Sequence, residues 1–153
     1  MTALSVIAGP KCGHHATEQS MRMILIAIAA ILGLAVGGLW NPGMAGTERP
    51  YEAGAFASAQ EAGKPILIDV TASWCPTCAR QRPIIAKLLQ ADEFAELVVF
   101  TIDYDADYNT AVAFKAYLQS TLIVFKGKNE RGRSTGDTRQ DSIRSLMQAA
   151  MKP

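Results

Sequence analysis

The stretch Asp69–Cys78, DVTASWCPTC, ends in two cysteines separated by two residues, and it decides how the rest of the chain is interpreted. The apolar, β-branched run Pro65–Thr71 predicts a buried strand, and Cys75–Ala91 predicts the helix that follows it. The cysteines therefore fall at a helix start, where unpaired backbone N–H groups and the helix dipole stabilise a thiolate on Cys75. A lowered pKa makes that sulfur a nucleophile, and Cys78, one turn further in, can resolve a mixed disulfide.

The cysteine pair has two other interpretations. Half of a zinc site would need a second cysteine pair or two histidines, but Cys12 and both histidines lie near the N-terminus, away from the body of the chain. A structural disulfide that closes such a small loop would add little stability. Thiol–disulfide exchange is the favoured interpretation, and we expect neither a metal nor a cofactor.

The N-terminal part of the chain contains a long uncharged segment. Its core, Met23–Trp40, is almost entirely apolar and follows Arg22, which is typical of a secretory signal or a membrane anchor. Its 18 residues are at the short end for crossing a bilayer, which takes about 20. Gly43 and Ala45 provide the small-x-small pattern that a signal peptidase needs. A cleaved signal and a retained anchor both stay open, and a buried core helix is the third interpretation.

Three segments follow from this pattern. We divide the chain into an unassigned extension (residues 1–22), a signal peptide or membrane anchor (residues 23–45) and a folded domain (residues 46–153). The domain is expected to lie outside the cytoplasm, which in a bacterium means the periplasm. It would be either free there or anchored to the inner membrane and facing the periplasm.

Helix and strand signals alternate along the folded domain. The expected elements are helix 51–62, strand 65–71, helix 75–91, strand 97–103, helix 106–118, strand 121–126, strand 131–135 and helix 140–151. Such alternation predicts an α/β domain with a central sheet that carries helices on both faces. The final hairpin makes the sheet mixed.

The quoted stretch resembles the thioredoxin family, and the similarity continues over most of residues 51–151. Pro83 matches the family's helix-kinking proline, and Thr121–Lys126 resembles the strand after its cis-proline. The resemblance, closest in kind to exported or membrane-anchored bacterial members, implies the thioredoxin fold. It also implies a redox disulfide between Cys75 and Cys78.

Asp69 is a lone acid inside an apolar strand, which is costly to bury unless it has a use. In the family, a buried acid at this position helps to move the proton of the second cysteine. We therefore expect desolvation to raise the pKa of Asp69, and we expect Asp69 to serve Cys78 as a catalytic residue. The alternative is a hydrogen-bonded aspartate at a strand end. Val99 stands where the family often has a lysine near this acid.

Five residues around the cysteines are expected to contact substrate: Trp74, Pro76, Thr77, Ser120 and Thr121. Trp74 offers a flat surface beside the nucleophile, although it could simply pack. Ser120 stands where the family has its cis-proline facing the sulfurs. A non-proline cis bond costs roughly 2.5–4 kcal/mol, which favours a trans Gln119–Ser120 bond with a reshaped loop, but the sequence leaves the isomer open. The hydroxyl would bind a thiolate or substrate backbone, or would only fill the turn.

These residues predict a protein-disulfide reductase or exchange enzyme that acts on exported proteins and is fed by a membrane electron donor. A redox potential of about −120 mV would instead mark a strong oxidant. The alternative is a metallochaperone or an assembly factor for a cytochrome or oxidase, favoured by Ser120, and an inert structural disulfide is the third hypothesis. We expect a monomer that contacts the membrane only through a retained anchor. A net charge of +1 gives no sign of a nucleic-acid partner.

Overall fold

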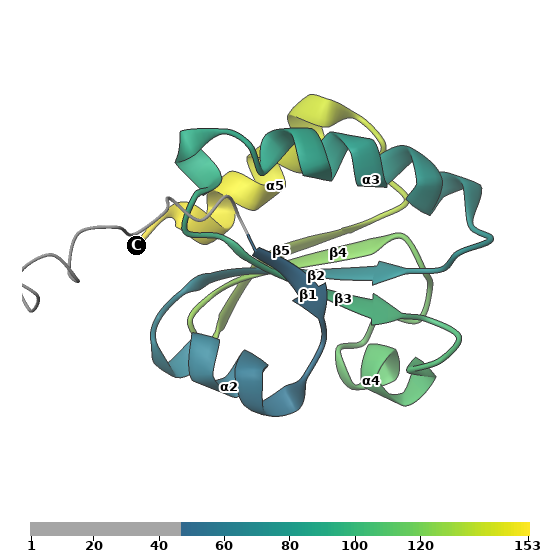
Figure 1. Cartoon of the computed structure of the whole chain (residues 1–153), viewed down its shortest axis with the longest axis horizontal. Helices are drawn as coiled ribbons and strands as arrows, with labels where there is room; N and C mark the ends of the chain where they lie inside the picture. The colour runs from purple at the N-terminus through teal and green to yellow at the C-terminus, as the bar shows by residue number, and fades with distance from the viewer. Residues whose placement is uncertain (1–46) are drawn as a thin grey trace, which may run out of the picture. The chain divides into compact units, whose positions relative to one another are not determined.

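A five-stranded mixed sheet organises residues 47–153, which are the residues that the computed structural model describes (Figure 1). The elements are β1 (Thr47–Pro50), α2 (Ala53–Glu61), β2 (Pro65–Thr71), α3 (Pro76–Leu88), the 3₁₀ helix η1 (Asp92–Phe94), β3 (Val98–Asp103), α4 (Tyr108–Ala113), β4 (Thr121–Lys126), β5 (Asn129–Thr135) and α5 (Gln140–Met151). The predicted extension and the apolar signal or anchor segment lie outside these residues. Within them, no helix is both long enough and apolar enough to cross a bilayer.

The sheet has the order β1-β3-β2-β4-β5, with β2 at its centre. Strand β2 runs parallel to β3 and antiparallel to β4, and the outer pairs are parallel for β1–β3 and antiparallel for β4–β5. The predicted mixed sheet is therefore confirmed. Asp69 lies opposite Thr101 of β3 on one side and Leu122 of β4 on the other, near the carboxyl end of β2.

Helices cover both faces of the sheet: α3 and α5 lie on one face, and α2 and α4 lie on the other (Figure 1). Alternate side chains of β2 enter the two cores, because successive residues of a strand point to opposite faces. Leu67 packs under α3 and α5, whereas Ile66 and Ile68 pack under α2 and α4. Asp69 shares the face of Leu67, so its carboxyl group lies on the side of α3.

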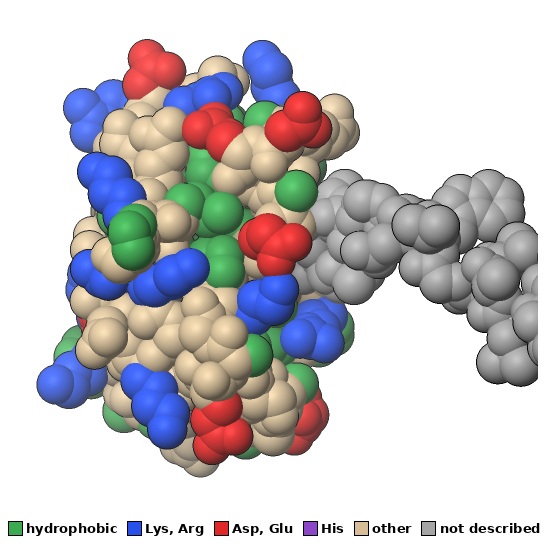
Figure 2. Space-filling view, turned by 90° about the vertical axis from the view of Figure 1, so that its left-hand side faces the viewer, with side chains coloured by type: hydrophobic (Ala, Val, Ile, Leu, Met, Phe, Trp, Pro, Cys, Tyr) green, Lys and Arg blue, Asp and Glu red, His purple; other side chains and the backbone are tan. Residues whose placement is uncertain are grey.

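The end of the domain opposite the β2–α3 connection carries charges of both signs. Figure 2 shows lysine and arginine side chains over the whole height of this face, with acidic side chains among them. A few hydrophobic side chains gather near its centre. This mixture is consistent with the low net charge of the chain, which is +1.

Strand β1, like the short 3₁₀ helix η1, was missed by sequence patterning. Its four residues, TERP, contain no apolar run, so no strand was expected there. The strand forms because β3 offers it a free edge, and an edge strand tolerates Pro50. Its Arg49 guanidinium lies 4.7 Å from the centre of the Phe100 ring, which ties the edge to the core.

Helix α4 is shorter than predicted, because it ends at Ala113 and not at residue 118. The Lys115 N–H donates to the Val112 carbonyl (2.8 Å), and the Ala116 N–H donates to the Ala111 carbonyl (2.9 Å). This hydrogen-bond pattern is a Schellman motif, which requires a left-handed residue; Lys115 has φ +55°. Helix α3 also stops three residues early, and β5 starts two residues early.

Replacing Lys115 with glycine is expected to raise the free energy of unfolding by about 0.5–1 kcal/mol. A left-handed conformation costs an L-residue roughly 1–2 kcal/mol, and the greater freedom of glycine in the unfolded chain offsets part of this gain. Urea denaturation would measure the change. Lys115→Ala is the matched control and should show no such gain, since alanine keeps the Cβ atom. Equal stabilisation by both variants would contradict the backbone explanation.

Candidate functional site

Cys75 is the N-cap residue of α3 and the sulfur on which the site is built. It has extended backbone angles, and its Sγ accepts a hydrogen bond from the Cys78 N–H (3.2 Å). Pro76 is the first helical residue, where a missing N–H leaves no bond unmade. Both cysteines are free thiols, with 3% of Cys75 and 1% of Cys78 exposed. The structure therefore brings the two predicted redox residues together in the dithiol form.

The surroundings of Cys75 favour its thiolate. Burial by itself would raise the pKa of the Cys75 thiol. Hydrogen bonds from the Cys78 thiol, the Ser120 hydroxyl and the backbone N–H groups of Cys78 and Thr77 outweigh burial and lower the pKa to about 7. A substantial share of the protein molecules then carries Cys75 as a thiolate at neutral pH. A pKa near ambient pH is also the best compromise between thiolate fraction and intrinsic nucleophilicity.

The Ser120 hydroxyl lies within hydrogen-bond distance of both sulfurs. Its Oγ is 3.1 Å from the Sγ of Cys75 and 3.1 Å from the Sγ of Cys78. The residue is buried and has φ +61°. Residues 47–153 contain no cis peptide bond, so the bond before Ser120 is trans. The two sulfurs therefore face a serine hydroxyl where other members of the family would present a proline.

Asp69 is buried on the side of β2 that faces α3. Desolvation, together with the nearby Glu48 carboxylate, raises its pKa to about 7, and Arg82 opposes the rise. The direction is the one expected from the sequence. Within the described residues, no hydrogen bond joins Asp69 to Cys78. The effect of Glu48 on Asp69 was not predicted, because Glu48 belongs to β1, a strand that the sequence did not reveal. In the sheet, Glu48 lies opposite Val99, the position that lacks the family's lysine.

The remaining predicted site residues differ in how far they reach the surface. Trp74 is 60% exposed, and its Nε1–H donates to Asp105 Oδ2 (2.6 Å), a partner that sequence patterning missed. Pro76 is exposed and Thr77 is half-buried. Thr121 is buried, and its hydroxyl donates to the Leu118 carbonyl (2.7 Å). The Thr121 hydroxyl is therefore engaged in a hydrogen bond within the protein. Within residues 47–153, no three His, Cys, Asp or Glu side chains gather as a metal site.

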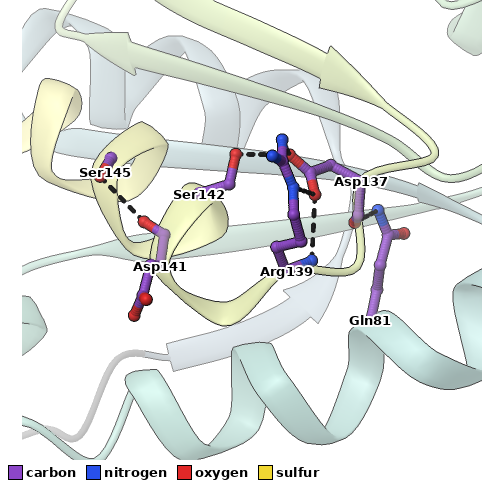
Figure 3. Close-up of polar contacts among 6 residues, drawn as sticks. All are labelled: Gln81, Asp137, Arg139, Asp141, Ser142 and Ser145. Atoms are coloured by element: carbon purple, nitrogen blue, oxygen red, sulfur yellow. Dashed lines mark hydrogen bonds and ion pairs between the residues drawn. The ribbon is translucent and has the colours of Figure 1, made fainter.

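Gln81 is a third residue that sequence patterning missed, after Glu48 and Asp105. It is 1% exposed, and its Nε2 donates to the Asp137 carbonyl (2.8 Å; Figure 3) and to the Ser120 carbonyl (3.3 Å). A signal was present in the sequence, since Gln81 is one helical turn before Ile85 and two before Leu88, both buried. An amide on the apolar face of a helix suggests a hydrogen-bonding role.

Comparison with known proteins places this site in a family. The thioredoxin family model matches residues 51–149. Thioredoxin H5 of Arabidopsis thaliana is 36% identical over 89 residues, which cover 58% of this chain and 74% of that protein. A thioredoxin of Mycolicibacterium smegmatis is 37% identical over 65 residues, which cover 41% of this chain and 57% of that protein.

A solved structure agrees with the family match. Trxlp from Edwardsiella tarda EIB202 is 34% identical and superposes with a TM-score of 0.64, covering 66% of this chain and 98% of that one. The order of strands and helices, the helix start at Cys75 and these matches lead to one conclusion. The chain has the thioredoxin fold and belongs to the thioredoxin family of thiol–disulfide oxidoreductases.

Proposed function

We propose that this protein reduces or exchanges disulfide bonds of exported proteins, with Cys75 as the nucleophile and Cys78 as the resolving cysteine. One observation carries the proposal. The Cys75 sulfur sits at the start of α3 among hydrogen-bond donors that bring its pKa to about 7, within reach of a second thiol. The uncharged segment before the domain, residues 23–45, supports exported substrates.

The reaction needs two exchange steps. The Cys75 thiolate attacks a substrate disulfide, so that a mixed disulfide forms and one substrate sulfur leaves as a thiolate. Cys78 then loses its proton and attacks the Cys75 sulfur, which releases the second substrate thiolate and leaves a Cys75–Cys78 disulfide. The substrate gains two electrons and takes up two protons in total. A dithiol donor must then return the enzyme to the reduced form.

Asp69 supports the second step in this proposal. Its pKa of about 7 makes it a group that exchanges protons at neutral pH, and it lies on the same side of β2 as α3. Trp74, Pro76 and Thr77 offer the surface beside the nucleophile, while Ser120 and Thr121 contribute the loop across from it. Substrate contacts through Thr121 would use its backbone, because its hydroxyl is already engaged.

The cellular setting forms part of the same proposal. We assign residues 23–45 to a signal peptide or anchor and place the domain outside the cytoplasm, in the periplasm of a bacterium. A membrane protein with a reactive dithiol would then supply electrons, since soluble reductants of the cytoplasm do not reach that compartment. The domain is proposed to act as a monomer.

A second candidate is a metal-carrying assembly factor for a cytochrome or oxidase. The observation that favours it is Ser120, which sets a hydroxyl beside two thiols where a proline ring would otherwise stand. Metal analysis after anaerobic purification separates the candidates. Stoichiometric metal that is lost in Cys75→Ser would favour the second candidate over disulfide exchange.

Trapping tests the proposed function. The full chain with Cys78→Ser, expressed in the native host, is expected to accumulate mixed disulfides between Cys75 and exported proteins, because no second thiol resolves them. Mass spectrometry after non-reducing electrophoresis would identify the partners. Cys75→Ser is the matched control and should trap none, and it should also lose insulin reduction. Equal trapping by both variants, or trapping of cytoplasmic proteins alone, would overturn the proposal.

A further inference from the structure

We propose that Gln81 and Ser120 act as one unit. Gln81 holds the main chain at Ser120, and the Ser120 hydroxyl donates its hydrogen bond to whichever of the two sulfurs is the thiolate. Gln81 is then a positioning residue, whereas Ser120 touches the reacting atoms. The inference rests on the proposed function, because it says how that same dithiol is tuned.

The position of the Ser120 hydroxyl supports a shared role. A serine hydroxyl has one proton to donate and two lone pairs, and here it is 3.1 Å from each sulfur. When Cys75 is a thiolate and Cys78 is a thiol, the Ser120 hydroxyl donates its proton to the Cys75 sulfur. Once Cys75 is in a mixed disulfide, its sulfur is neutral. The hydroxyl can then rotate its proton to Cys78 as that thiol ionises for the second attack.

The backbone at Ser120 needs to be held for this arrangement. A φ of +61° is uncommon for a residue with a Cβ atom, so the surroundings must fix it. The Ser120 carbonyl accepts from the Gly136 N–H (2.9 Å) and from Gln81 Nε2 (3.3 Å). The first bond comes from the end of β5 and the second from α3. The Ser120 carbonyl is therefore held by two hydrogen bonds that come from different elements.

Gln81 also links the loop to the start of α5. Its second acceptor is the Asp137 carbonyl, and the Asp137 carboxylate is bound by Arg139 and Ser142 (Figure 3). Because both partners are carbonyl oxygens, the NH₂ end of the Gln81 amide must face them. An amide is costly to bury, and an apolar residue would fill this helix position without that cost. The hydrogen bonds to the Ser120 and Asp137 carbonyls give the amide a use.

Removing the hydroxyl tests the first half of the unit. Ser120→Ala and Ser120→Gly should both raise the pKa of Cys75 and lower its thiolate fraction below neutral pH about tenfold, because a hydrogen bond to a charged group is lost. Iodoacetamide alkylation rates against pH would report this change. Equilibration with glutathione should shift towards the disulfide by up to about tenfold, since the reduced form loses a stabilising contact. Glycine accepts the positive φ and alanine does not, so an equal shift in both identifies the hydroxyl.

A double-mutant cycle tests the second half of the unit. Gln81→Met keeps a similar volume without the amide donors, and it should lower the Cys75 thiolate fraction about threefold in the wild-type background. In the Ser120→Gly background, Gln81→Met should change the Cys75 titration no further. Gln90→Met, at an exposed glutamine just past α3, is the control and should leave the titration unchanged in both backgrounds.

Two results would overturn the inference. An unchanged Cys75 titration in both Ser120 variants would remove the role of the hydroxyl, whatever Gln81 does. An equal effect of Gln81→Met with and without the hydroxyl would show that the two residues act separately. Failure of the proposed function is distinguishable, because the wild-type protein would then show no exchange with insulin. Failure of this inference alone leaves wild-type exchange intact.

Discussion

Asp69→Asn is expected to raise the free energy of unfolding by about 4 kcal/mol above about pH 8 and to change it little below about pH 4. Burial raises the pKa of this carboxyl group from 3.8 to about 7. The folded protein therefore holds a proton that the unfolded chain releases, and stability falls as pH rises between these values. At 1.36 kcal/mol per pH unit, the gap corresponds to about 4 kcal/mol. Asparagine has a similar shape and no charge to bury.

Urea denaturation of both proteins between about pH 4 and pH 9 would measure this difference. The wild-type protein should lose stability relative to the variant through the range, and the difference should level off above the folded pKa. Asp107→Asn is the control, because this exposed residue makes no side-chain cap hydrogen bond and should change stability by less than about 0.5 kcal/mol. A difference that does not vary with pH would contradict burial of an ionisable group as the cause.

The same substitution should slow the exchange reaction. Asparagine takes up no proton, so release of the mixed disulfide by Cys78 loses the proposed acceptor. Stopped-flow measurement of the second step at neutral pH would show whether Asp69→Asn is slower although it is more stable. A buried acid that lowers stability and raises turnover is the pattern expected of a residue retained for function. Unchanged turnover would assign Asp69 to the fold alone.

Phe100→Ala is expected to lower the free energy of unfolding by about 3–5 kcal/mol, the typical cost of emptying a buried aromatic site. Phe100 is fully buried on the α2–α4 face of the sheet. Its ring centre lies 5.8 Å from that of Phe56 and 6.2 Å from that of Tyr51. It also supports the Arg49 guanidinium of β1. A domain of this size has a total stability of only about 5–15 kcal/mol, so this loss leaves it marginal.

Thermal and urea unfolding, followed by circular dichroism, would report the loss. Tyr117→Ala is the matched control, because this aromatic residue is 63% exposed and its removal should change stability by no more than about 0.5 kcal/mol. A loss below about 1 kcal/mol in Phe100→Ala would mean that the neighbouring rings collapse into the cavity. The packing described for this face would then be wrong.

Local patterns in the sequence were sufficient for most of the domain. The apolar runs of β2 and β4 and the periodicity of α5 predicted these elements with the observed bounds. The expected thioredoxin fold with a mixed sheet is confirmed, as is thiol–disulfide oxidoreductase chemistry. The helices and strands depend on periodicity over a few turns, and the fold and chemistry were implied by the resemblance of the residues around the two cysteines to the thioredoxin family. Both signals lie in contiguous stretches of the sequence.

Other features depended on contacts between distant segments. Strand β1 has no pattern of its own and exists because β3 leaves an edge open to it. Helix α4 ends at a left-handed Lys115, and the sequence did not indicate this end because lysine, unlike glycine, is not typical of a left-handed position. Glu48 acquires its effect on Asp69 only through the pairing of β1.

The Trp74–Cys78 segment shows the division most clearly. The sequence by itself determined the cysteine pair, its place at the start of a helix after a buried strand and the family to which the chain belongs. Only the tertiary structure placed the Ser120 hydroxyl beside both sulfurs and the Gln81 amide against the Ser120 carbonyl. The physical reason is that a helix start is specified by neighbours in the chain. A hydroxyl equidistant from two sulfurs requires three segments, α3, the Ser120 loop and the start of α5, to be packed in one register.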